Sequence, residues 1–101
     1  MQSNFKTLNL SIQFHKECQK LKMKSYLKSQ LERATSSVAL NLSEGNARFS
    51  LKDRRRFFQI AYASLKEAEV ALLLASISSK KLLDLSDHLG ACLYNLIRRC
   101  T

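Results

Sequence analysis

Residues 51–77 read LKDRRRFFQIAYASLKEAEVALLLASI, a stretch without glycine or proline. It predicts one long helix. Ser50 and Asp53 have the spacing of a helix cap, in which the serine oxygen accepts a hydrogen bond from a free amide of the first turn. From Ile60 onward the predicted helix is apolar almost all round, and such a helix must be covered on several sides. Because a bundle of 101 residues can hardly cover it, we expect copies of the chain to associate.

Three further helices are expected around this one, and together they predict an up-and-down four-helix bundle. Residues 5–22 place apolar side chains at helical spacing, as do the residues beyond a short break at Ser78–Ser79. A capping pattern predicts that the second helix begins at Ser29. Gly45 is expected to end that helix in the left-handed conformation that glycine tolerates.

The composition favours a wholly α-helical protein with one domain over residues 1–101. Hydrophobic residues make up 46% and charged residues 25%, as in globular domains, and two glycines without proline leave little for hairpin turns. The longest apolar stretch, residues 70–75, is far shorter than the ~20 residues that cross a bilayer, so no membrane association is expected. Three cysteines without tight spacing indicate reduced thiols and a cytoplasmic location.

Positive charge is concentrated in the first half of the chain. The net charge is +9, and residues 1–56 hold twelve lysines and arginines against four acids. Two basic groups stand out: Lys16, Lys20, Lys22, Lys24 and Lys28, and then Arg48, Lys52, Arg54, Arg55 and Arg56. Guanidinium groups match phosphate oxygens with paired hydrogen bonds, and helix amino termini also attract anions. We therefore expect these ten residues to bind RNA or DNA without reading its sequence; the alternative is a solvated surface that serves solubility.

One polar row lies beside the apolar face of the predicted second helix: Gln30, Arg33, Ser37, Asn41 and Glu44. Steps of three or four residues place these side chains on one side of a helix. The row is interpreted as a hydrogen-bonded seam that faces Glu67 and fixes how two helices pair, with a binding site as the alternative.

Catalytic and metal-binding patterns are weak. His15 with Cys18 and His88 with Cys92 would offer four zinc-type ligands, but buried free cysteine usually behaves as a small hydrophobic residue. The chain has no glycine-rich phosphate loop, no G-x-S-x-G and no H-E-x-x-H. We expect no enzymatic activity, no metal and no cofactor.

Several short segments carry a resemblance to a known family: SQLERA at 29–34, SV at 37–38, NLSEG at 41–45 with Arg48, FFQIA at 57–61 and SLKE at 64–67. They resemble the four-helix-bundle family that contains proteins encoded in intervening sequences of large-subunit ribosomal RNA genes. The same family contains the accessory variability determinants of diversity-generating retroelements. The resemblance covers roughly residues 12–75, and the fourth helix matches only in character. Ser43 and Ala63 replace an alanine and a glycine that are common in relatives.

The resemblance implies a ring-like homopentamer with a positively charged surface. For the retroelement branch, to which residues 14–31 and 52–58 are more similar, it also implies association with a reverse transcriptase and with RNA or DNA. We therefore expect a basic accessory protein that binds nucleic acid. The rival hypothesis is an oligomeric structural or interaction protein, encoded in a ribosomal RNA intervening sequence, that does not bind nucleic acid directly.

Overall fold

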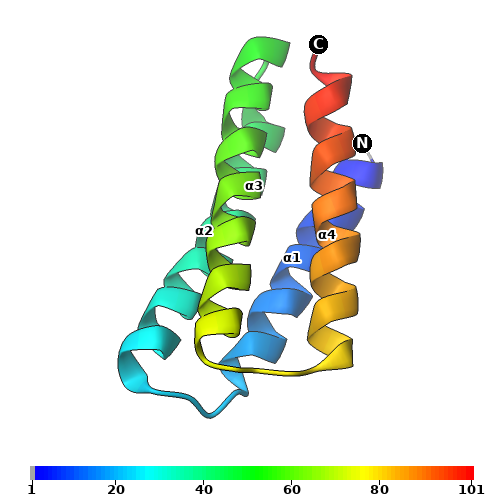
Figure 1. Cartoon of the computed structure of the whole chain (residues 1–101). Helices are drawn as coiled ribbons and strands as arrows, with labels where there is room; N and C mark the ends of the chain where they lie inside the picture. Colours follow the sequence, from blue (N-terminus) through cyan, green and yellow to red (C-terminus); the bar gives the residue numbers. More distant parts are fainter. Residues whose placement is uncertain (1) are drawn as a thin grey trace.

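The computed structural model describes residues 2–101, with side chains from Asn4 onward, and these residues form helices without any strand. The four helices are α1 (Gln2–Gln19), α2 (Ser25–Ala47), α3 (Leu51–Leu74) and α4 (Lys80–Arg99). They run alternately up and down, so that both termini and the α2–α3 connection lie at the same end (Figure 1). Sequence neighbours pack together, and α1 closes the bundle against α4. The predicted all-α four-helix bundle is confirmed.

The core is filled by apolar side chains from all four helices. Within each helix they recur at steps of three, four or seven residues, which places them on one face. The fully buried members include Phe14 and Cys18 of α1, Leu31, Val38 and Leu42 of α2, Phe58, Ala61 and Leu65 of α3, and Leu89 and Leu93 of α4. The most extensive helix pair is α2 with α3, which are joined by only three residues.

Gly45 does not end α2, and this prediction was wrong. No glycine in the described chain has a positive φ, and α2 continues to Ala47. The reason for glycine is steric, because an added Cβ would lie 2.5 Å from Cε1 of the buried Phe58 ring. Gly45 thus allows α2 and α3 to approach closely where Phe58 packs.

The predicted ends of the first three helices were also shifted. Helix α2 begins at Ser25 rather than Ser29, without a side-chain cap. The additional turn buries Leu27, which is only 7% exposed. Burial of a leucine stabilises the fold by about 1.5–3 kcal/mol, which outweighs the roughly 1 kcal/mol of a side-chain cap.

Helix α1 occupies residues 2–19 rather than 5–22. The Lys28 ammonium donates to the carbonyls of Gln19, at 2.7 Å, and Leu21, and so caps its end.

Helix α3 ends at Leu74, three residues before the predicted Ile77. Ser76 takes the left-handed conformation with φ 57°, and its amide donates to the Leu73 carbonyl while that of Ile77 donates to Leu72, both at 3.0 Å. This hydrogen-bond pattern is the Schellman motif. The predicted cap at Ser50 is confirmed, since it accepts from the Asp53 amide at 3.1 Å; Ser79 caps α4 in the same way.

Candidate nucleic-acid interface

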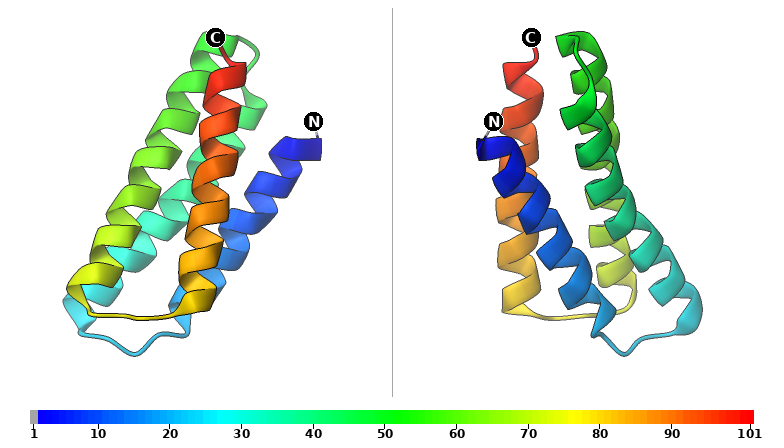
Figure 2. Two further views of the ribbon diagram at one scale, coloured as in Figure 1. Left: turned by 45° about the vertical axis from the view of Figure 1, so that its right-hand side comes forward. Right: turned by 180° about the vertical axis from the view of Figure 1, so that it is seen from behind.

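The two basic groups predicted from the sequence lie at opposite ends of the bundle. Lysines 16–28 surround the α1–α2 connection, whereas residues 48–56 form the α2–α3 connection and the first turns of α3 (Figure 2). The longest dimension of the molecule is 40 Å, so one subunit cannot present all ten residues on a single small surface. We call these regions the lysine end and the arginine end.

Helix α4 contributes two further cations to each end. Helix α4 begins with Lys80 and Lys81 at the lysine end and finishes with Arg98 and Arg99 at the arginine end. Up-and-down topology alone could have located them, because it places the end of α4 beside the start of α3. The arginine end therefore consists of Arg48, Lys52, Arg54, Arg55, Arg56, Arg98 and Arg99.

At the lysine end, much of the charge is already used within the fold. Glu17 pairs with Lys20 at 2.8 Å and with Lys81 at 3.1 Å, and these two ammonium groups hold the pKa of the Glu17 carboxyl below its usual value. Lys80 pairs with Asp84 at 3.0 Å.

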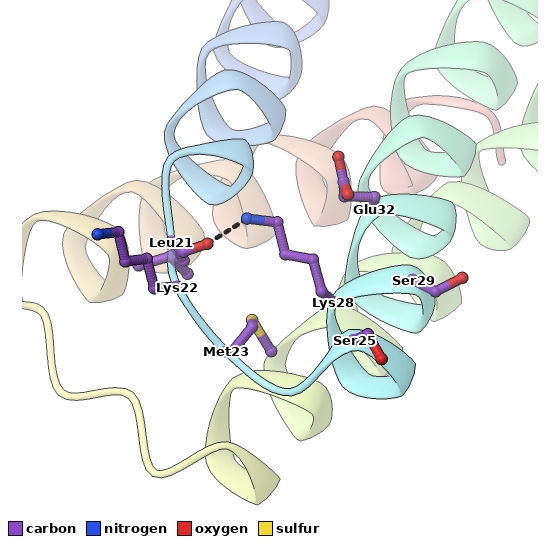
Figure 3. A pocket seen from close by; sticks show the side chains of 7 residues that line it. All are labelled: Leu21, Lys22, Met23, Ser25, Lys28, Ser29 and Glu32. Carbon is purple, nitrogen blue, oxygen red and sulfur yellow. Dashed lines mark hydrogen bonds between the residues drawn. The ribbon is translucent and has the colours of Figure 1, made fainter.

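A pocket at this end contains one lysine, Lys28, that serves the fold. It is lined by residues of the α1–α2 connection and the first turns of α2. Figure 3 shows Lys28 spanning the pocket toward the Leu21 carbonyl, while Lys22 points away from it. The Lys28 ammonium, which could have met an anion here, instead caps α1.

At the arginine end, an aromatic ring holds two guanidinium groups. The Arg48 and Arg56 Cζ atoms lie 4.8 and 4.5 Å from the centroid of the Phe57 ring. The Arg54 Nε donates to the Arg48 carbonyl at 2.8 Å, and Arg48 also pairs with Glu44 at 2.9 Å. Stacking on a ring restricts a guanidinium but leaves its edge N–H groups available, which lowers the entropy lost when it binds a phosphate.

Much of the charge at the arginine end has no acidic partner. Among the residues that the structure describes, no carboxylate lies within ion-pair distance of Lys52, Arg55, Arg56 or Arg98. Helix α4 ends at the same end of the bundle as the start of α3. Burial raises the pKa of the Cys100 thiol there, and the charges of Arg54 and Arg55 act against that rise. The amino terminus of α3 adds the positive end of its dipole. The arginine end is thus suited to a polyanion.

The polar row on α2 forms a seam with α3 whose hydrogen bond is made by Ser64, whereas Glu67 lines the same groove as Gln30 of the row. Ser37 and Ser64 hydroxyls lie 2.8 Å apart, and the Asn41 amide donates to the Ser37 carbonyl at 2.9 Å. Glu67, the predicted partner, is exposed. The other members lie on the surface, where Arg33 donates to Gln30 at 3.4 Å. The seam therefore fixes the pairing of α2 with α3 through Ser64.

No metal centre is formed by the described side chains, since they contain no group of three or more metal-ligating residues. Burial raises the pKa of the Cys18 thiol to about 12, which disfavours the thiolate that a metal needs. The His15 Nδ1 lies 2.6 Å from the Thr35 hydroxyl and joins α1 to α2. Within residues 2–101, no helix has the length and apolar character needed to cross a membrane.

One comparison with known proteins gives a match. The family model described as 23S rRNA-intervening sequence protein matches residues 2–94. No curated protein and no solved structure matches the chain. This match confirms the resemblance to the intervening-sequence proteins. The matched residues include α1 to α3 and most of α4.

Proposed function

The chain belongs to the family of 23S rRNA-intervening sequence proteins. From the charges and contacts of its arginine end, we propose that it acts by binding the phosphates of nucleic acid there. Four cations there have no carboxylate partner among the described residues: Lys52, Arg55, Arg56 and Arg98. Because three lysines at the other end, Lys16, Lys22 and Lys24, have none in the described chain either, unpaired charge alone does not distinguish the two ends. The observation that carries the proposal is therefore the stacking of two guanidinium groups, those of Arg48 and Arg56, on the Phe57 ring. Binding of this kind is largely independent of base sequence.

The salt dependence of binding tests this function. With about four phosphate contacts, the affinity for an RNA hairpin should fall roughly 100-fold between 50 and 200 mM salt, because each contact releases condensed counterions. Fluorescence anisotropy of a labelled hairpin measures this decrease. If the protein binds neither RNA nor DNA at low salt, the rival function stands: an oligomeric structural or interaction protein whose charge serves solubility.

We also propose that the chain assembles with itself, as the sequence resemblance to ring-like homopentamers implies. Support comes from large apolar side chains exposed on α2 and α3, among them Leu40, Ile60, Val70, Leu73 and Leu74. Val70 and Leu74 line a groove between the two helices with Leu27. Sedimentation should give a multiple of the 11.5 kDa chain, and Val70→Glu with Leu74→Glu should lower that mass. A monomeric wild-type protein would rule out the assembly.

As a protein partner we propose a reverse transcriptase, on the resemblance of residues 52–58 to the retroelement branch. The genes that surround the gene of this protein distinguish the proposal of a reverse-transcriptase partner from the rival function. A neighbouring reverse-transcriptase gene with template and variable repeats, and co-purification of the two proteins, would support it. A position inside a ribosomal RNA gene would favour the rival.

A further inference from the structure

The connection between α2 and α3 presents an aromatic ring entirely to solvent. Phe49 is 100% exposed, and Leu51, two residues further along, is 54% exposed. Phe49 lies between the last residue of α2 and the cap of α3, at the end of the bundle rather than along a helix side. It therefore does not belong to the exposed apolar side chains of α2 and α3 through which copies of the chain would associate.

Cations flank this ring in the sequence and lie at the same end of the bundle. Arg48 precedes it, Lys52 and Arg54–Arg56 follow within two turns, and Arg98 and Arg99 end α4 on the same side of the molecule. An ordinary apolar partner would have to remove water from these charges when it covered the ring, which is costly. A partner that offers flat apolar surfaces on a polyanionic chain meets both features at once.

Resting on the nucleic-acid binding proposed above, we propose that the arginine end recognises single-stranded nucleic acid, with Phe49 stacked on an unpaired base. Lys52, Arg55 and Arg56 then contact the phosphates that flank this base. In a duplex the bases stack on each other and offer no face to a protein ring, whereas unpaired bases do. Stacking accepts every base, so the interaction stays independent of sequence.

A membrane surface fits these observations less well. Interfacial membrane binding uses an apolar stripe along a helix that lies in the plane of the bilayer. Here the exposed apolar side chains of the α2–α3 connection are Phe49 and Leu51, on either side of the cap of α3, and they form no stripe along a helix. A nucleobase, by contrast, needs only one ring.

Replacing Phe49 tests the stacking directly. Phe49→Ala should weaken binding to a short unstructured RNA by about tenfold, and binding to the same RNA annealed to its complement by less than about twofold. The matched control is Tyr26→Ala, which removes an exposed aromatic ring beside lysines at the opposite end and should change neither affinity. Because Phe49 is fully exposed, circular dichroism should show an unchanged fold.

The chain contains no tryptophan, so Phe49→Trp introduces a single fluorescent reporter at this position. This variant should bind as tightly as the wild type, and its emission should be quenched by the single strand but not by the duplex.

Five results would overturn the inference. Equal losses for single strand and duplex, or no loss for either, would leave nucleic-acid binding in place but remove the stacking. Absence of all RNA binding by the wild type would remove both proposals. A lower sedimentation mass for Phe49→Ala would assign the ring to a contact between copies. Loss of binding to phosphatidylserine vesicles, with RNA affinity unchanged, would assign it to a membrane.

Discussion

Replacing Lys52, Arg55 and Arg56 with glutamate weakens binding to an RNA hairpin by about 100-fold or more at moderate salt, whereas the same change at Lys16, Lys22 and Lys24 costs less than about tenfold. None of these six side chains pairs with a carboxylate in the described structure, so none of the substitutions breaks an ion pair of the fold. Both variants change the net charge equally. A difference between them therefore reports local phosphate contact rather than the long-range field.

The salt dependence of the same two variants provides a second measurement. The logarithmic slope should become shallower by about two to three for the arginine-end variant and should hardly change for the lysine-end variant. Thermal unfolding followed by circular dichroism checks that both remain folded. Equal losses of affinity would show that net charge alone attracts the RNA, and a larger loss at the lysine end would reverse the assignment.

Gly45→Ala should lower the free energy of unfolding by about 1–3 kcal/mol, the usual cost of overpacking a well-packed core. The added methyl group would lie 2.5 Å from Cε1 and 2.8 Å from Cδ1 of Phe58. The Phe58 ring is buried, so it cannot turn into solvent to relieve the clash. Either the ring or the pairing of α2 with α3 must shift.

Gly90→Ala is the matched control, and its effect should have the opposite sign. Gly90 also lies inside a helix, but a Cβ there would be 3.6 Å from Leu65 Cδ2, an ordinary contact. Alanine is then favoured by about 0.5–1 kcal/mol through helix propensity. Urea unfolding at one fixed chain concentration compares the two variants, since assembly makes stability depend on concentration. A Gly45→Ala protein as stable as the wild type would contradict the close packing of Phe58.

The sequence predicted the helices well because their signals are local. Helical periodicity and the scarcity of glycine and proline identified the bundle, and the cap at Ser50 was found from its spacing to Asp53. Gly45 was misread because a glycine before a polar segment looks the same whether it needs a left-handed conformation or a close neighbour. Only the position of Phe58 distinguishes the two. Ser76 takes the left-handed position without the glycine that usually marks it.

The candidate site was predicted only in part. A sequence shows which residues are charged, but it does not show which of these charges are paired within the fold. The run from Arg48 to Arg56 was identified, but the roles of Lys28 as a helix cap and of Glu17 as a partner for two lysines depend on tertiary contacts. Phe49 carried no periodic signal, since it lies outside the helices. Its significance comes from its complete exposure at the arginine end.

Hydrogen–deuterium exchange with and without RNA tests the location of the interface most directly. If the phosphates bind at the arginine end, added protection should appear in residues 48–56 and 97–101, while residues 20–28 and 78–84 exchange as before. Protection concentrated at the α1–α2 connection, or spread evenly along the sides of the helices, would contradict the assignment.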